Sequence, residues 1–477
     1  MSKLPKYFIM QVWEVIDEHI NIEGVLNYFT GEDKFSIIQK IYDNSFINDE
    51  IKENLRNNRK RRNQTKKRWV QGAIKDYKKP NTKSPKELTE EYKFLKSSLE
   101  NYGETGFQEF FRKQTPEEVI EERIEILQNW CNDTNSYLSN YFYMKKKADS
   151  QIEKAVVADI VIIIGDLLMK KYDGNIQDVI IEKPYSYVSH PIFSEGRGKL
   201  DLSEDTIKQD MSNYRYNDFN PTSEYTLRIL VAQEYSEKKQ VGLLDNTDEK
   251  IFSEVLKYRN ELFATQRKVV VEIGQIVKNL FKSKSVENYK LVQERLLKMV
   301  NMKFNVFHKG GILVFGLFET LKIDYNTEGW VAEVTVNDHI YQEYLNNQTI
   351  RMYKDSIKRF ELPLSRSLIF ALQKERFLRY SQNKSYEQVY SYNFFASVLR
   401  FKNGNRKDNY NQLKAALEEI VEHGAGIKSF AYEGDKFKIE YIPVTQYEVE
   451  DLLHSPSQMT HLLGFETSAQ LSRSTIN

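Results

Sequence analysis

Two segments of the chain repeat one arrangement of polar side chains that could contact a nucleic-acid duplex. Residues 287–300 read ENYKLVQERLLKMV, and residues 408–421 read DNYNQLKAALEEIV. Asparagine and glutamine amides can bond to base edges, while lysine side chains can reach bases or phosphates. We therefore expect DNA contacts from Asn288, Lys290, Gln293, Glu294 and Lys298 in the first segment, and from Asn409, Asn411, Gln412 and Lys414 in the second.

Both segments are predicted to be amphipathic helices that present these side chains on one face. An offset of 121 residues (409 − 288) aligns Asn288 with Asn409 and brings two apolar stripes into register. The stripes have spacings of four and three, which bury one face of a helix, and they comprise Val292, Leu296 and Met299 in the first segment and Leu413, Leu417 and Ile420 in the second. Tyr289 and Tyr410 lie on these stripes, three residues before Val292 and Leu413, so core packing is preferred over stacking or a phosphate contact.

The segments on either side of each helix repeat as well. A short apolar helix is predicted at residues 271–281 and again at 391–401, and a polar basic turn follows each one. Two β-like strings around a glycine-containing turn come after each long helix, with the turns at residues 308–311 and 433–435. Helix N-termini and basic turns favour phosphate, so we expect backbone contacts from Lys282, Lys284 and Lys309 in the first copy and from Arg400, Lys402, Arg406 and Lys407 in the second.

Helix, turn, helix and β-hairpin is the order of a winged-helix module. In such a module the second helix enters the major groove and the hairpin lies along the DNA backbone. The sequence therefore predicts two of these modules in tandem. The alternative is a pair of generic helix-plus-hairpin folds that pack against each other.

A basic run near the N-terminus is a third candidate contact. Between Lys52 and Lys79 there are 12 Lys and Arg residues against Glu53 and Asp76, a net charge of +10 (12 − 2). This local charge predicts nucleic-acid binding, with expected contacts from Arg59, Lys60, Arg61, Arg62, Lys66, Lys67 and Arg68. The run could act as a backbone-binding arm or, with Trp69, as a stacking platform. The alternative is a solvated basic helix or connector.

The total composition does not itself indicate a nucleic-acid partner, because 69 Lys and Arg against 68 Asp and Glu leave a charge of +1. The single cysteine, Cys131, excludes an intramolecular disulfide and suits a reducing interior, so a cytoplasmic location is expected. The N-terminus lacks the pattern of a signal peptide. The most apolar run, residues 155–169, contains Asp159 and Asp166 and is shorter than the roughly 20 residues that span a bilayer. We expect a buried segment there and no membrane partner.

A search for catalytic motifs finds no pattern that would support an enzyme. The chain has no G-x-x-x-x-G-K-[ST] phosphate loop, and its seven histidines lack metal-binding spacing. We therefore expect no catalytic residues, no metal site and no cofactor.

The pattern along the chain predicts five regions and a mainly α protein with small β-hairpins, in the α+β class. A mostly helical N-terminal domain is expected at residues 1–180, including the basic segment 52–79. Breaker residues then mark a linker at 181–221. The two modules are expected at residues 222–345 and 346–445, and a C-terminal tail at 446–477.

Residues 222–445 resemble the replication initiator proteins of iteron-containing theta-replicating plasmids, a family whose fold is two winged-helix domains in tandem. The resemblance lies in residues 225–258, 287–307 and 362–380. It implies binding to double-stranded DNA with repeated sites, with the second module as the stronger reader and the first also able to form a homodimer. It further implies recruitment of the host replication initiator and helicase. The N-terminal 200 residues exceed the core of this family.

Three other functions are compatible with the same modules. A plasmid or prophage transcriptional regulator would use the same DNA-reading helices without opening DNA. A scaffold or partition adaptor would use the modules to bind protein, because winged helices also dock proteins. A nuclease or integrase is the most distant alternative, because no acidic cluster supports it.

Overall fold

The computed structural model describes residues 3–20, 33–46, 51–78, 87–112, 115–190, 192–193, 199–201, 208–211, 214–219, 226–232, 240–308, 311–327, 329–399, 401 and 405–453. Contacts divide the chain into two compact units, Met1–Val179 and Ile180–Asn477. Each unit is described by itself.

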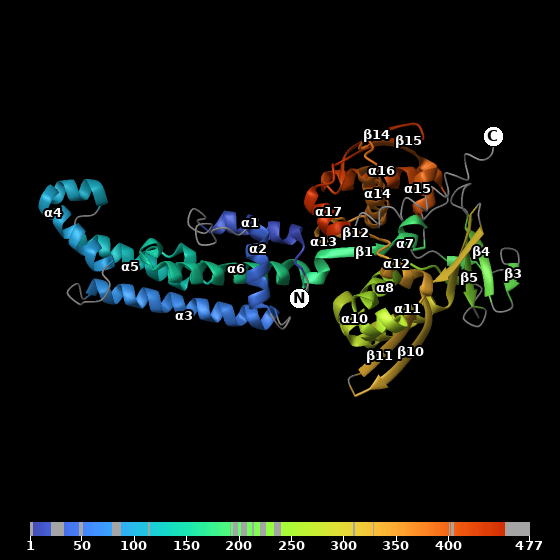
Figure 1. Ribbon diagram of the computed structural model, residues 1–477, viewed down its shortest axis with the longest axis horizontal. Helices are drawn as coiled ribbons and strands as arrows, with labels where there is room; N and C mark the ends of the chain where they lie inside the picture. Colours follow the sequence, from blue (N-terminus) through green and yellow to red (C-terminus); the bar gives the residue numbers. More distant parts are fainter. Residues whose placement is uncertain are drawn as a thin grey trace. The chain divides into compact units, whose positions relative to one another are not determined.

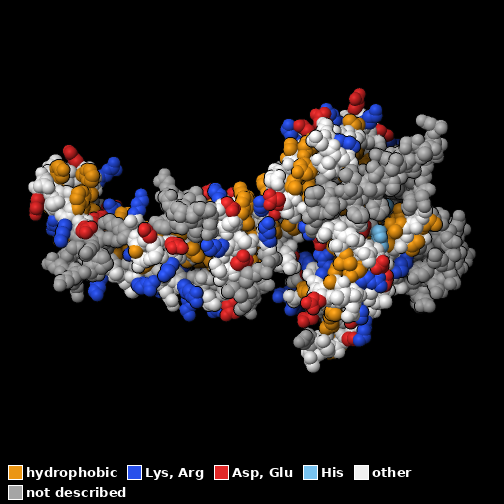
Figure 2. All heavy atoms as spheres, in the orientation of Figure 1, with side chains coloured by type: hydrophobic (Ala, Val, Ile, Leu, Met, Phe, Trp, Pro, Cys, Tyr) orange, Lys and Arg blue, Asp and Glu red, His pale blue; other side chains and the backbone are white. Residues whose placement is uncertain are grey.

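The first unit is helical in its described residues (Figure 1). Its longer helices are α1 (Lys6–His19), α2 (Lys34–Ser45), α3 (Ile51–Lys78), α4 (Glu87–Phe111), α5 (Pro116–Asn132) and α6 (Asp149–Tyr172). Helix α3 packs against α5 and α6, and Lys and Arg side chains gather along it in Figure 2. The basic run of the sequence is therefore a helix that also supports the unit.

Helix α6 contains the most apolar run of the chain and forms much of the core of this unit. Residues 160–164 are at most 3% exposed, and α1, α2 and α3 all pack against this helix. The buried Asp159 carboxylate accepts the N–H groups of Leu138 at 3.0 Å and Ser139 at 2.8 Å. Burial raises the pKa of Asp159 to about 6. The expectation of a buried segment is confirmed, and none of the helices in the described ranges is long and apolar enough to cross a membrane.

The second unit contains one order of elements twice, namely helix, strand, helix, helix and a two-stranded hairpin (Figure 1). In the first module these are α8 (Asn246–Lys257), β7 (Lys268–Glu272), α10 (Ile273–Leu280), α11 (Val286–Val300), β10 (Phe318–Asn326) and β11 (Gly329–Val336). In the second module they are α14 (Pro363–Ser381), β13 (Glu387–Ser391), α15 (Tyr392–Val398), α16 (Arg406–Glu422), β14 (Ile427–Glu433) and β15 (Lys436–Tyr441).

The two modules also pair their strands in the same way. Each has a three-stranded antiparallel sheet, ordered β10-β11-β7 in the first and β14-β15-β13 in the second. The predicted apolar stripes of α11 and α16 lie in two separate hydrophobic cores. Both amphipathic helices and the mainly helical α+β class with small antiparallel sheets are therefore confirmed.

The first module has an additional hairpin that the second lacks in its described residues. Strands β8 (Met302–His308) and β9 (Gly311–Gly316) pair as predicted. They extend a five-stranded sheet ordered β3-β4-β5-β8-β9, in which β3 is Lys208–Met211, β4 is Tyr214–Phe219 and β5 is Thr226–Ala232. The counterpart of β14–β15 is instead β10–β11, because β11 pairs with β7. The assignment of residues 302–318 as the hairpin of the first module was therefore wrong. Alternation along the sequence identifies a hairpin but not the sheet that it joins.

Residues 181–221, expected to be a linker, contain strands that pair with other parts of the unit. They hold part of β1 (Ile180–Pro184), helix α7 (Tyr185–Ser189), and strands β2 (Lys199–Asp201), β3 (Lys208–Met211) and β4 (Tyr214–Phe219). Strand β4 pairs with β5 (Thr226–Ala232), and β2 pairs with β6 (Gln240–Gly242). Pro184 is the last residue of β1, and the tyrosine and phenylalanine residues of β4 favour the strand conformation.

Strand β1 connects the two modules through a two-stranded sheet. It pairs with β12 (Thr349–Tyr353), which lies between the modules in sequence. The Glu182 carboxylate accepts from Thr349 Oγ1 at 3.3 Å and Arg351 Nε at 3.4 Å, and it also pairs with Arg259. The remaining elements of the unit are α9 (Glu261–Gln266), α12 (Asp338–Leu345), α13 (Lys354–Lys358) and α17 (Gln446–Leu452).

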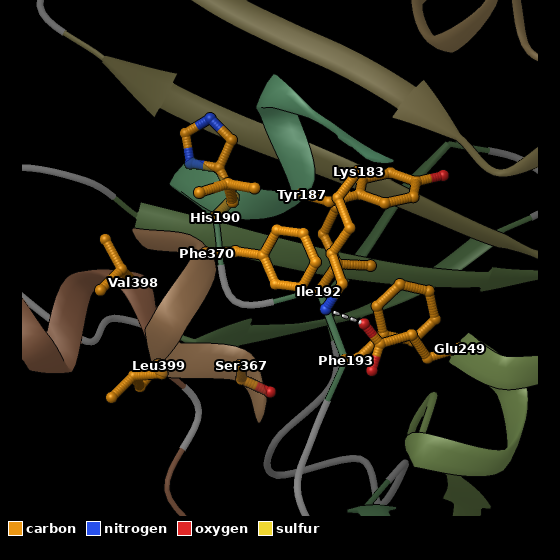
Figure 3. A pocket seen from close by; sticks show the side chains of 11 residues that line it. Lys183, Tyr187, His190, Ile192, Phe193, Glu249, Ser367, Phe370, Val398 and Leu399 are labelled. Atoms are coloured by element: carbon orange, nitrogen blue, oxygen red, sulfur yellow. Dashed lines mark ion pairs between the residues drawn. The ribbon is translucent and has the colours of Figure 1, made fainter. Parts of the chain in front are cut away.

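A small pocket lies beside this junction and is lined from both modules (Figure 3). Lys183 of β1 pairs with Glu249 of α8, and its Nζ lies 4.1 Å from the ring centroid of Phe370 on α14. His190 and Ile192 contribute to the wall. Lys183 therefore contacts both modules.

A buried carboxyl at the same junction is expected to make stability depend on pH. Glu343 of α12 is 4% exposed and accepts from Ser186 N–H at 2.9 Å and Ser186 Oγ at 2.8 Å. Burial raises the pKa of Glu343 from 4.5 to about 8. Between pH 4.5 and about 8, Glu343 is ionised in the unfolded chain but keeps its proton in the folded state. The free energy of unfolding therefore falls as the pH rises through this range, and the stabilisation that is present below pH 4.5 is lost by about pH 8.

We expect Glu343→Gln to make the urea-unfolding midpoint depend less on pH between 5 and 8, since glutamine does not ionise. Glu361→Gln is the matched control, because Glu361 is exposed. An unchanged pH dependence in Glu343→Gln, measured by fluorescence, would contradict the assignment of a raised pKa.

Candidate nucleic-acid interface

Helix α16 begins at a side-chain cap and buries one face in the core of the second module. Asn405 Oδ1 accepts the N–H of Lys407 at 3.0 Å, which satisfies a free donor of the first turn. Leu413, Leu417 and Ile420 are 0% exposed. The opposite face is therefore directed to solvent.

The exposed face of α16 changes charge along its length. Lys407, Asn411 and Lys414 follow one another at spacings of four and three in the N-terminal half, with Lys407 and Asn411 exposed and Lys414 half-buried. Glu418 and Glu422 are exposed in the C-terminal half. The N-terminal half is therefore more positive than the C-terminal half, although Asp408 is also exposed there.

The β14–β15 hairpin is fastened to the same N-terminal half. Tyr410 Oη donates to the carbonyl of Gly434 at 2.7 Å, and Arg406 pairs with Asp435. Lys414 Nζ donates to Tyr432 Oη at 2.7 Å and lies 4.2 Å from the centroid of that ring. The cationic end of the helix and the hairpin tip therefore form one continuous surface.

Five residues predicted for the second module have different outcomes. Asn409 is 6% exposed, so its inclusion among the exposed contacts was wrong; it lies on the inner side of the first turn. Gln412 is half-buried and stays a prediction. Tyr410 packs against Phe437, with centroids 4.9 Å apart. The expected contacts Arg400 and Lys402 lie outside the described residues.

Helix α11 of the first module presents a shorter polar surface. Ser285 caps it by accepting the N–H of Asn288 at 3.4 Å, and the Asn288 amide donates back to the Ser283 carbonyl at 2.8 Å. The same amide nitrogen also lies 3.3 Å from Ser283 Oγ, so the N–H groups of Asn288 are less available for a base. The exposed members of the predicted set are Lys282, Lys284, Lys290 and Glu294, with Gln293 partly exposed.

Lys298 was wrongly placed on this polar surface, because the structure buries it against α8. It is 6% exposed, and its Nζ donates to Asp248 Oδ2 at 2.8 Å and to the Leu243 carbonyl at 2.5 Å. Arg295 Nη1 lies 2.9 Å from carboxylate oxygens of both Asp245 and Asp248. Burial lowers the pKa of Lys298 and raises that of Asp248. The signal missed in the sequence was the acidic capping box Asp245–Asp248.

The hairpin tip of the first module carries aromatic residues that the sequence did not single out. Tyr325 of β10 faces Trp330 of β11 in register, with ring centroids 5.1 Å apart, and Tyr325 is 71% exposed. Lys322 pairs with Asp324 on the same hairpin at 2.6 Å. The expected contact Lys309, which follows β8 in the sequence, lies outside the described residues.

Two of the seven predicted contacts in the basic segment face the interior of the first unit. Arg62 is 5% exposed and donates to the Thr134 carbonyl. Lys66 is 0% exposed, donates to the Asp133 carbonyl at 2.8 Å, and has its pKa lowered to about 8 by burial. Both assignments were wrong, because α3 turns these side chains toward the loop after α5. Arg59 pairs with Asp166, whereas Lys60, Arg61, Lys67 and Arg68 are exposed.

Within the described ranges, no three His, Cys, Asp or Glu side chains form a group that could hold a metal ion.

No family model matches the chain, and no curated protein matches it. Among solved structures, a selenomethionine form of domains 2 and 3 of RctB matches with a TM-score of 0.32 and 9% identity, covering 54% of this chain and 98% of that chain. A second structure of RctB domains 2-3 matches with a TM-score of 0.29 and 10% identity, covering 55% and 98%. At these TM-scores the similarity establishes neither the fold nor the function.

Proposed function

We propose that the second unit contains two winged-helix modules that bind double-stranded DNA, and that the protein is a replication initiator of a plasmid or phage-like element. The observation that carries this proposal is the N-terminal half of α16. There Lys407 and Asn411 are exposed and Lys414 is half-buried, and hydrogen bonding by Tyr410 and an ion pair of Arg406 hold this row against a hairpin.

This geometry suits entry of α16 into the major groove. In helix-turn-helix proteins the N-terminal residues of the recognition helix contact base edges. Asn411 can pair with an adenine edge through its amide, while Lys407 can neutralise a phosphate. The acidic C-terminal half would point away from the backbone, so the charge gradient favours a single orientation of the helix.

The two modules are proposed to read different sequences. Helix α11 offers Lys290, Gln293 and Glu294, whereas α16 offers Asn411 and Lys414. Glutamate accepts from cytosine, and asparagine pairs with adenine. One chain would thus recognise a composite site. Binding of repeated sites, formation of a homodimer and recruitment of the host initiator and helicase complete the proposal, which includes no catalytic step.

The test combines binding with replication. Purified protein is footprinted on the DNA around its own gene at two or more salt concentrations, and a plasmid carrying only this gene and its flanking DNA is introduced into a host without other replicons. We expect protection of short direct repeats and maintenance of the plasmid. Protection of one promoter site without replication would instead indicate a transcriptional regulator, and absence of DNA binding would favour a protein-binding scaffold.

A further inference from the structure

Helix α3 carries a basic surface that the two modules do not account for. Of the 13 exposed residues between positions 52 and 75, eight are Lys or Arg, and only Glu53 is acidic. Lys and Arg side chains accordingly line this helix in Figure 2. A surface helix ordinarily mixes both signs of charge, so this composition points to an anionic partner.

The structure separates the cations that support the fold from those that are available to a partner. Arg62 and Lys66 bond to backbone carbonyls, and Arg59 pairs with Asp166. Exposed cations without an ion pair among the described residues then extend along the helix. Seven residues meet this description, and we call the six that follow Lys52 the basic ridge: Arg56, Lys60, Arg61, Lys67, Arg68 and Lys75.

The length of the basic ridge matches a DNA duplex. Arg56 and Lys75 are 19 residues apart (75 − 56), which corresponds to about 29 Å at the rise of an α-helix. One turn of duplex DNA is about 34 Å long and carries a negative charge about every 1.7 Å. Several phosphates can therefore be neutralised at once.

Single-stranded nucleic acid fits the same helix poorly. Proteins that bind single strands combine a basic groove with exposed aromatic rings on which bases stack. The nearest aromatic residue, Trp69, is half-buried, and its ring already packs against Tyr141, with centroids 5.0 Å apart, and against Lys147 Nζ at 5.4 Å. The basic ridge itself contains no aromatic residue.

We propose that the basic ridge binds the sugar–phosphate backbone of double-stranded DNA without reading bases. It would be a third DNA contact of the chain, in the unit that lacks the repeated modules. The proposal does not rest on the function proposed for those modules, because the ridge residues all belong to the first unit.

The test measures the salt dependence of binding by the full chain to a 30-base-pair duplex of arbitrary sequence, using fluorescence anisotropy. Each phosphate contact contributes about 0.9 to the slope of log K against log salt. The triple substitution Lys60→Gln, Lys67→Gln and Lys75→Gln is expected to lower the slope by about 2 to 3. The matched control replaces Lys93, Lys154 and Lys170, which are exposed on α4 and α6, by glutamine. It should leave the slope unchanged, and Lys→Arg at the three ridge positions should retain it.

Two results would overturn the proposal. One is an equal slope for the ridge and control variants; the other is a lowered slope on a single-stranded 30-mer without a change on the duplex. The double variant Lys407→Gln and Lys414→Gln separates this site from the modules. If the modules do not bind DNA, that variant will behave as the unsubstituted protein, while the ridge variant will still show the lower slope.

Discussion

Replacement of Asp248 by alanine is expected to lower the free energy of unfolding of the first module by about 3–5 kcal/mol. Asp248 is 0% exposed, and the substitution leaves the buried Lys298 ammonium without its nearest carboxylate. Removing one partner of a buried ion pair is costly because the remaining charge has lost its hydration. Hydrogen exchange of the α11 amides at increasing urea concentrations measures the effect on this module within the full chain.

Two further variants test the cause of this loss. Asp324→Ala removes an ion pair whose side chains are 59% and 70% exposed, so a change below about 1 kcal/mol is expected. The double variant Asp248→Leu and Lys298→Met removes both charges and should be more stable than Asp248→Ala. A double variant less stable than Asp248→Ala would show that the charge of Lys298 is not the cause.

Asn411→Ala is expected to weaken binding to the preferred DNA site about 5- to 150-fold, which corresponds to about 1–3 kcal/mol for one bidentate base contact. Selection of bound sites from randomised duplexes measures this effect whichever DNA sequence the protein prefers. The variant should lose preference at one or two adjacent positions, because a base edge is left without its partner. Gln293→Ala should relax different positions, since it belongs to the other module.

The matched control is Gln342→Ala, which removes an exposed amide from α12 outside both reading helices. It should leave the selected site and the affinity unchanged. Identical preferences at every position for the unsubstituted protein and Asn411→Ala would exclude α16 as the reading helix. Relaxation of the same positions by Asn411→Ala and Gln293→Ala would contradict a composite site.

The sequence predicted the elements of the second unit better than the directions of their side chains. The stripes Val292–Met299 and Leu413–Ile420 identify α11 and α16, because burial of one helical face requires a period that can be read from the chain alone. The hairpin after α16 was found for a similar reason, since its glycine turn separates two β-rich strings. These features depend on neighbours close in sequence.

The errors at the candidate interface arose where distant residues determine the outcome. Lys298 was counted as exposed because lysine is a charged residue. Its ammonium group is buried, however, and bonds to Asp248, which lies 50 residues away in the sequence. Lys66 likewise bonds to a carbonyl 67 residues away. A lysine or arginine at the border between the buried and exposed faces of a helix can point toward either face. Its direction depends on tertiary partners, which the hydrophobic periodicity of the sequence does not reveal.

The pairing of β1 with β12 has a consequence for the order in which the chain folds during synthesis. Glu182 and Thr349, which bond across this sheet, are 167 residues apart. At a translation rate of roughly 5–20 residues per second, β12 follows β1 from the ribosome after roughly 10 to 30 s. The first module has its own hydrophobic core, so it can fold within this interval. During this interval the backbone groups of β1 that bond to β12 have no partner. The pairing of β1 with β12 is therefore expected to be a late folding step, and a nascent chain that ends before residue 349 cannot form it.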